Sequence, residues 1–304
     1  MDDPQMAQMN VDKRKTLRAY LDLVRLPNLF TAAADVLAGF LFAGGMLSEW
    51  TVLFRLIGAS ICLYAGGVIL NDVADVQLDT AERPHRPIPS GVIARSKALA
   101  LAGLLLLLGI GLAALVSTQA LLVAAAIFVS IILYNLLKPT PAGPVLMGLC
   151  RAFNLLLGMY GLNTLLPLPA VRPMGAMFLY VTFLTVFARR EAGGTSRGRL
   201  VLGTAGMAAA VVSLWGLRWH GDNSHYHEYR FLAAALLGGV LYLGLTSILQ
   251  PTAMRVQRAV KFFIMGIVLL DAAVAWNASG PAGAIAVLSL LFPCVLLARV
   301  LRVT

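Results

Sequence analysis

The sequence has little charge and little cysteine. Charged residues make up 12% of its 304 positions, about half the share of a soluble globular domain, so an ordinary soluble protein is excluded. Cys62, Cys150 and Cys294 lie in apolar stretches far apart in the sequence, so neither a disulfide framework nor a cysteine metal site is predicted. The sequence also lacks a basic patch interleaved with aromatic residues, so the net charge of +10 does not predict a nucleic-acid partner.

A cleavable signal peptide is not predicted at the N-terminus either. The first apolar stretch follows the charged segment from Asp12 to Arg25, contains polar residues and has no small-residue cleavage site. No linker or low-complexity tract divides the remainder. We therefore expect residues 1–25 to be a cytoplasmic N-terminal segment and residues 26–304 to form a single transmembrane domain.

Long hydrophobic runs dominate the sequence, which is 59% hydrophobic with a mean hydropathy of +0.82. Windows of about 17 to 22 apolar residues are long enough to cross a bilayer as helices. They fall at about 26–45, 52–71, 98–117, 119–137, 143–163, 174–189, 200–217, 231–249, 259–276 and 281–300. The prediction is an all-α, polytopic membrane bundle of about ten transmembrane helices.

The cations predict the orientation of this bundle. If the N-terminus is cytoplasmic, most of the 24 Lys and Arg residues fall in segments on the cytoplasmic side, as the positive-inside rule requires. We expect an integral, multi-pass protein of the cell inner membrane with both termini in the cytoplasm. The lipid bilayer is thus its first predicted partner.

One acidic segment stands out in this apolar sequence. Asp72, Asp75 and Asp79 are spaced i, i+3 and i+7, so on a helix they share one face, where their charges repel unless a cation lies between them. Mg²⁺ prefers carboxylate and phosphate oxygens, and Arg83 and Arg86 follow as candidate clamps for a diphosphate. The alternative is a solvated helix end without a ligand.

The segment Asn71-Asp72-x-x-Asp75-x-x-x-Asp79 with Arg83 and Arg86 resembles the first aspartate-rich motif of the UbiA superfamily of intramembrane prenyltransferases. Tyr134-x-x-x-Lys138 is similar to a second signature of that family. The resemblance implies a helical bundle around a central cavity open to the cytoplasmic side, with Mg²⁺ as cofactor. It also implies two substrates, an isoprenyl diphosphate and a lipophilic, in some members aromatic, acceptor.

Carried over to this sequence, the resemblance implies roles for individual residues. Asp72, Asp75 and Asp79 are expected to hold Mg²⁺, and Lys138 is expected to assist the chemistry with them. The expected substrate-binding residues are Asn71, Arg83, Arg86, Tyr134, Arg151, Asn154, Arg189, Arg190 and Glu191.

The sequence departs from the family pattern in the loop after the sixth span, where the superfamily carries a second acidic motif. Here the loop has a single carboxylate, Glu191, beside Arg189 and Arg190. Either Glu191 holds a metal alone while the arginines neutralise diphosphate, or the site binds a prenyl diphosphate without ionising it efficiently. This loop and the tenth span make the sequence similar to the UbiA-like EboC group.

Two acids lie within predicted spans, Asp35 in the first and Asp271 in the ninth. Charged groups are costly in lipid, so both are expected to face the bundle interior. They either pair with a neighbouring helix, with Arg151 as a candidate partner, or act in acceptor binding or proton removal. Arg151 and Asn154 share a helix face and are expected to line the cavity.

Three functions therefore compete. The leading prediction is an enzyme, a UbiA-type prenyltransferase that moves an isoprenyl group from its diphosphate to a lipophilic acceptor with Mg²⁺. The second is a catalytically weak or inactive UbiA-like protein that transports or presents a specialised lipophilic metabolite. The third is an ion transporter that uses Asp35 and Asp271. An outer loop with Asp222, His225 and His227 is interpreted as a solvated connector rather than a metal site.

Overall fold

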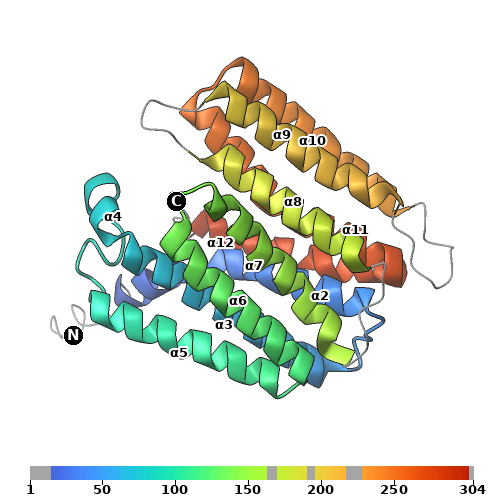
Figure 1. The fold of residues 1–304 in the computed structure, drawn as a ribbon, viewed down its shortest axis with the longest axis horizontal. Helices are drawn as coiled ribbons and strands as arrows, with labels where there is room; N and C mark the ends of the chain where they lie inside the picture. The colour runs from blue at the N-terminus through green and yellow to red at the C-terminus, as the bar shows by residue number, and fades with distance from the viewer. Residues whose placement is uncertain (1–14, 163–169, 190–195, 217–227, 301–304) are drawn as a thin grey trace, which may run out of the picture.

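The protein is a bundle of long helices (Figure 1). The computed structural model describes residues 15–162, 170–189, 196–216 and 228–300, and these contain no β-strand. The longer helices are α2 (Leu26–Phe42), α3 (Trp50–Ala74), α5 (Arg95–Ala114), α6 (Thr118–Leu137), α7 (Ala142–Met159), α8 (Val171–Ala188), α9 (Arg197–Ser213), α10 (Tyr229–Leu249) and α11 (Ala253–Ser289). The shorter elements are α4 (Val76–Glu82), α12 (Leu291–Val300) and the 3-10 turns η1 (Tyr160–Leu162) and η3 (Leu214–Gly216).

The number of membrane crossings agrees with the sequence prediction. Within the described residues, nine helical stretches are long and apolar enough to span a membrane. The last runs from Ala253 to Arg299, 47 residues, and at about 1.5 Å per residue it is far too long for one crossing. Its backbone breaks at Gly280, where φ is 66°, immediately before Pro281. The break divides this stretch into the predicted ninth and tenth segments, so the all-helical membrane fold is confirmed.

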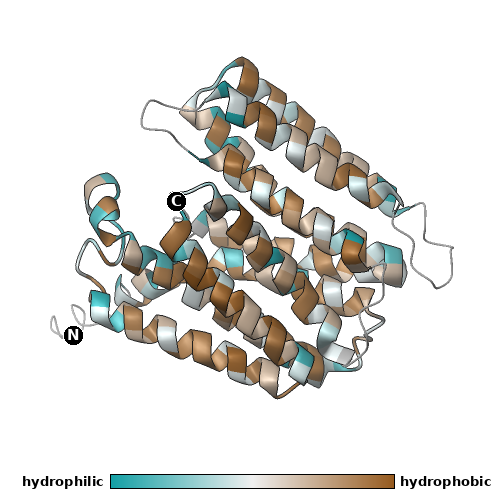
Figure 2. Cartoon of the chain, viewed as in Figure 1, coloured by the Kyte–Doolittle hydropathy of each residue, from teal (hydrophilic) through white to brown (hydrophobic). Residues whose placement is uncertain are grey.

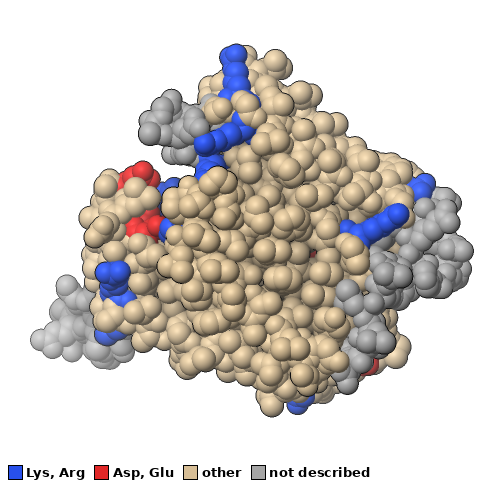
Figure 3. Space-filling view, viewed as in Figure 1, with Lys and Arg blue, Asp and Glu red and all other residues tan. Residues whose placement is uncertain are grey.

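The hydrophobic surface of the bundle explains why the sequence has so little charge. Large apolar side chains such as Leu107, Leu122 and Phe231 are more than 60% exposed, as expected of helices that face lipid. Figure 2 shows hydrophobic residues along the outward helix faces and hydrophilic ones mainly near the helix ends. Figure 3 shows the same division as a broad uncharged surface with charged groups near its margins.

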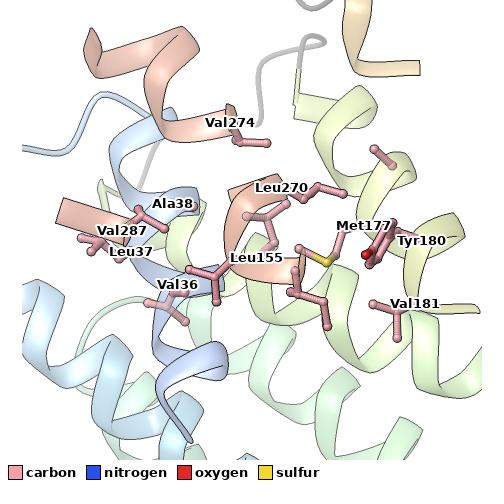
Figure 4. Close-up of a cluster of buried hydrophobic side chains, with 14 of the residues drawn as sticks. Val36, Leu37, Ala38, Leu155, Met177, Tyr180, Val181, Leu270, Val274 and Val287 are labelled. Atoms are coloured by element: carbon pink, nitrogen blue, oxygen red, sulfur yellow. The ribbon is translucent and has the colours of Figure 1, made fainter. Parts of the chain in front are cut away.

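The core lies where α2, α7, α8 and α11 meet (Figure 4). Val36 and Leu37 from α2, Leu155 from α7 and Leu270 from α11 are all buried in it. In Figure 1, α8, α9 and α10 form one layer and α3, α5 and α6 another, with α2, α7 and α11 between them. Helix α2 is therefore held on several sides, and its position depends on all of these contacts.

Several helix ends that carry polar residues meet at one end of the bundle. The end of α3, the whole of α4, the start of α2 and the end of α6 lie there together (Figure 1). A helical segment over residues 15–23 precedes α2, and its Leu23 is buried in a small second core with Ile69 and Ile93. These contacts fix the start of α2 against the end of α3.

Candidate active site

The acidic motif is divided between two helices, which corrects the expectation of one continuous helical face. Helix α3 ends at Ala74, Asp75 lies between the helices with φ −88° and ψ 6°, and α4 begins at Val76. Helix-like hydrogen bonds still connect the parts, because the Asp75 amide donates to the Asn71 carbonyl at 2.9 Å and the Asp79 amide to the Asp75 carbonyl at 2.8 Å. The three carboxylates thus remain neighbours, but Asp75 has a different cation partner from the other two.

Arg86 lies between Asp72 and Asp79. Its Nη1 atom is 2.6 Å from Asp79 Oδ2 and 3.4 Å from Asp72 Oδ1, and all three side chains are at most 10% exposed. The chain can return to this point because the turns at residues 83–94, rich in proline, follow α4. Arg86, which was predicted as a diphosphate clamp, thus lies beside two of the aspartates, and its role toward a diphosphate stays a prediction.

Lys138 reaches the same site from the end of α6. Its Nζ atom pairs with Asp75 Oδ1 and also donates to Asn71 Oδ1 at 3.2 Å. Tyr134 lies one turn earlier on α6, half-buried, where the charge of Asp75 acts on its hydroxyl group. The tertiary structure thus brings the two sequence signatures together.

Arg25 is the site residue that the sequence analysis did not identify. Its Nη2 atom is 2.9 Å from Asp72 Oδ1, although the two residues are on different helices. Arg25 is the only described non-glycine residue with positive φ, at φ 49° and ψ 54°, and it directly precedes α2 with Pro27 in the first turn. A left-handed conformation costs an L-residue about 1–2 kcal/mol, and such strain often accompanies function. In the sequence, Pro27, two residues after Arg25, was the only available signal of this position.

Substitutions at Arg25 distinguish the effect of its charge on donor binding from the effect of its backbone conformation on stability. Arg25→Gly relieves the left-handed strain and removes the guanidinium. We therefore expect the free energy of unfolding to change by no more than about 1 kcal/mol. Affinity for an isoprenyl diphosphate should fall about tenfold, the loss of one charge-assisted contact. Calorimetry of donor binding measures this effect. Arg25→Lys, which keeps the charge, should bind more tightly than Arg25→Gly, and equal affinities in the two variants would contradict the assignment.

The other predicted site residues lie in several places. Arg83 is half-buried at the end of α4 and makes no ion pair with a described residue. Arg189 directly follows α8, and its Nη2 donates to the backbone carbonyl of Lys138 at 2.6 Å, which ties the end of α8 to the site. Arg190 and Glu191 lie outside the described residues, as does the loop with Asp222, His225 and His227.

Arg151 and Asn154 do not reach the acidic motif. Both are buried in α7 and contact α2: Arg151 Nε is 3.2 Å from Asp35 Oδ2, and Asn154 Nδ2 donates to the same oxygen at 2.8 Å. Asn154 also donates to the carbonyl of Ala32 at 2.9 Å. The expected pairing of Asp35 with Arg151 is present, and these contacts hold α7 against α2.

The donor atoms of the motif suit Mg²⁺, which prefers carboxylate and amide oxygens. In this structure the carboxylates hold protein cations instead, and no group of three acidic, His or Cys side chains within the described ranges is arranged to hold a metal. Arg86 Nη1 occupies a position between Asp72 and Asp79 that a cation can take. The residues fit Mg²⁺ provided that Arg86 and Lys138 turn away from the carboxylates.

Known proteins resemble this chain over part of its length. Digeranylgeranylglyceryl phosphate synthase from Saccharolobus solfataricus is 35% identical over 149 residues, which cover 47% of this chain and 51% of that protein. The protein of the same name from Methanopyrus kandleri is 38% identical over 148 residues, covering 47% and 54%. The chain therefore matches about half the length of these curated relatives. They do not point to the EboC group in particular.

Solved structures share the fold. A UbiA homologue from Aeropyrum pernix K1 superposes with a TM-score of 0.65 at 17% identity, covering 81% of this chain and 96% of that one. A UbiA homologue from Archaeoglobus fulgidus, bound to DMAPP and Mg²⁺, gives 0.63 at 14% identity, covering 89% and 99%. The model of the UbiA prenyltransferase family matches residues 32–264, which include the acidic motif and Lys138. The chain therefore belongs to the UbiA prenyltransferase family.

Proposed function

We propose that this protein transfers an isoprenyl group from an isoprenyl diphosphate to a lipophilic acceptor in a Mg²⁺-dependent reaction at the cytoplasmic end of the bundle. The observation on which this proposal depends is the charged site, which we define as Asn71, Asp72, Asp75 and Asp79 with Arg25, Arg86 and Lys138. Its three carboxylates and three cations come from α3, α4, α6, the turns after α4 and the residue before α2.

The charged site is balanced without a ligand, and this balance supports binding of a metal diphosphate. Asp72, Asp75 and Asp79 each pair with a protein cation. A magnesium diphosphate brings both a cation for the carboxylates and an anion for the basic side chains. Each protein charge can therefore exchange one partner for another without becoming unpaired, which avoids the cost of an isolated buried charge.

The residues of the charged site then divide the chemical work. Asp72, Asp75 and Asp79 would hold Mg²⁺, and the bound ion would supply stabilisation of the negative charge on the diphosphate. Arg25, Arg86 and Lys138 donate hydrogen bonds to the diphosphate oxygens as the bond between carbon and oxygen breaks. Arg189 positions Lys138 through its backbone carbonyl. The apolar helix faces nearby exclude water from the allylic cation.

The proposal also ranks the acceptors that the isoprenyl group could be transferred to. The relatives' name describes a digeranylgeranylglyceryl phosphate product, so a geranylgeranylglyceryl phosphate is the first acceptor to test, and an aromatic acceptor is the second. A specialised metabolite, as the EboC resemblance suggests, is the third. With one carboxylate in the loop after α8, the arginines beside Glu191 are proposed to supplement diphosphate neutralisation there.

The reaction itself is tested with purified protein in lipid vesicles. Geranylgeranyl diphosphate and each acceptor are supplied with Mg²⁺, and release of diphosphate is measured together with formation of the prenylated product. We expect both products in equal amounts with one acceptor class, and at least about a hundredfold loss when EDTA removes the metal.

Two other outcomes have different meanings. Tight, Mg²⁺-dependent donor binding without product across all acceptors would favour the carrier that presents a lipophilic metabolite. Product formation that is equally fast with and without Mg²⁺ would overturn the proposed chemistry. A catalytically inactive Asp75→Ala protein, reconstituted in the same vesicles, provides the background rate.

A further inference from the structure

Two acidic side chains lie together in the middle of the bundle. Asp35 is near the centre of α2 and Asp271 is in α11, both with 0% exposure. Their carboxyl groups lie close enough to interact directly, and Asp35 Oδ1 and both oxygens of Asp271 have no hydrogen-bond partner among the described residues. Figure 4 shows their sequence neighbours Val36 and Leu270 among buried hydrophobic side chains. Both acids are therefore enclosed within the helix bundle, away from its surface.

The charges around this pair do not balance if both acids are ionised. Arg151 Nε is 3.2 Å from Asp35 Oδ2, and Arg151 acts electrostatically on both carboxyl groups. Two carboxylates and one guanidinium leave a net negative charge, and like charges in contact repel strongly where water is absent. A carboxyl pair in this setting requires one more positive charge.

The hydrogen bonds lead to the same requirement. Asn154 Nδ2 donates to Asp35 Oδ2, but neither oxygen of Asp271 accepts a hydrogen bond from a donor group among the described residues. Two carboxylates that touch have no hydrogen between them, whereas a carboxylic acid and a carboxylate have one. A single proton thus satisfies the contact and balances the charge.

Among the described residues, no cation other than Arg151 forms an ion pair with Asp35 or Asp271. From α3, the Tyr64 ring centroid lies 6.0 Å from the guanidinium carbon of Arg151. From α8, the Tyr180 hydroxyl is occupied because it donates to the Phe263 carbonyl at 3.0 Å. Cys150 of α7, next to Arg151, is a thiol. None of these three groups carries a positive charge.

We propose that Asp35 and Asp271 form a one-proton site in the core of the bundle, in which the two carboxyl groups share a single proton and Arg151 balances the remaining negative charge. The shared proton connects α2 to α11, and the contacts of Arg151 and Asn154 connect α2 to α7.

The one-proton site is a positioning element and takes no part in the transfer chemistry. At about 1.5 Å per residue, Asp35 lies about 15 Å along the helix axis from Arg25 at the start of α2. It therefore cannot touch a diphosphate bound at the charged site. Its effect is to fix the helix that carries Arg25, and it does not depend on the proposed reaction.

The number of protons is tested by the pH dependence of reversible unfolding in mixed detergent micelles. Above about pH 5 an unfolded Asp is ionised, so the folded state holds a proton that the unfolded chain releases. Raising the pH then favours unfolding, and this site should raise the unfolding equilibrium constant about tenfold per pH unit. Asp271→Asn should lose this factor, because its amide donates to Asp35 permanently. The quantity compared is the difference in pH dependence between wild type and Asp271→Asn, because all other titratable groups are common to the two proteins.

The matched control is Glu49→Gln, which makes the same carboxyl-to-amide change in a half-buried residue outside the core. It should keep the pH dependence of the wild type. An equal pH dependence in wild type and Asp271→Asn would overturn the one-proton site. If Asp271→Asn does not fold, Asp35→Asn provides the same comparison, with Arg151 then paired to Asp271.

Infrared spectroscopy of the folded wild type gives a second, direct measurement. A protonated carboxyl group at neutral pH gives a C=O stretching band that shifts in D₂O, and the Glu49→Gln protein should show the same band. Absence of this band in the wild type would disprove the shared proton. If the band is absent and the stability rises with Na⁺ concentration at fixed pH, a monovalent cation, and not a proton, lies between the two carboxyl groups. This result would also overturn the proposal.

Discussion

Asp72→Asn is expected to reduce Mg²⁺-dependent product formation by a factor of about 10² to 10³, the usual effect of removing one electrostatic contact with the transition state. Asp72 is the acid that pairs with both Arg25 and Arg86, at 2.9 and 3.4 Å, and its side chain is only 8% exposed. The amide has nearly the same shape but no charge, so it binds Mg²⁺ and the two cations much more weakly than the carboxylate does. Initial rates at saturating donor measure the effect.

Glu82→Gln is the matched control for Asp72→Asn. Glu82 ends α4 in the same acidic segment, but it is exposed and forms no ion pair with a described residue. We expect its rate to remain within about twofold of the wild type, because an exposed charge contributes little. If Asp72→Asn keeps more than a tenth of the activity, Asp72 is not a metal ligand. Equal losses in both variants would mean that the whole segment acts through its net charge.

Gly158→Ala is expected to destabilise the bundle by at least about 3 kcal/mol, the upper end of the cost of overpacking a core. A Cβ atom on Gly158 would lie 2.1 Å from the Val36 carbonyl oxygen in α2. The contact is reciprocal, because a Cβ on Gly39 would lie 2.0 Å from the Leu155 carbonyl oxygen in α7. Backbone atoms cannot turn aside as a side chain can, so the two helices must separate. Unfolding in mixed micelles measures the loss.

Gly103→Ala tests whether the close contact, rather than glycine itself, causes that loss. Gly103 lies within α5, is exposed and has no atom within 4 Å of its added Cβ. We expect no destabilisation, because alanine favours a helix over glycine. Similar losses for Gly103→Ala and Gly158→Ala would show that the approach of α2 and α7 is not special. Gly158→Ala should also weaken donor binding, since α2 follows directly from Arg25.

Much of the fold could be predicted because its signals are local. The apolar windows identify the spans, and the break before the tenth span is marked by Gly280-Pro281, a sequence that interrupts a helix. The end of α3 was less predictable. Nothing in the order of residues from Asp72 to Asp79 distinguishes one continuous helix from two helices that meet at Asp75. The hydrogen bonds across the junction remain helix-like, so the local pattern is nearly the same in both cases.

The candidate site was predictable where a motif concentrates polar residues in an apolar chain. Such groups are costly to bury without a partner, so Asp72 and Arg86 stand out in an apolar chain, whereas Lys138 was identified by the resemblance of Tyr134-x-x-x-Lys138 to a family signature. Arg25 was overlooked because it lies among other basic residues near the N-terminus and its role depends on a partner far along the chain. Arg151 and Asn154 were assigned to substrate binding for the opposite reason: a polar helix face has the same appearance whether it meets a ligand or another helix.

The sequence by itself determined the membrane class, the number of spans and the acidic motif, because each depends on the free energy of moving residues between water and lipid within one segment. The tertiary structure decided which partner each buried charge has. Asp75 pairs with Lys138 and Asp72 with Arg25, while Asp35 meets Arg151 and Asp271. Electrostatic and hydrogen-bonding energies fall off over a few ångströms, so they depend on helix packing, and the order of residues along the chain does not state those distances.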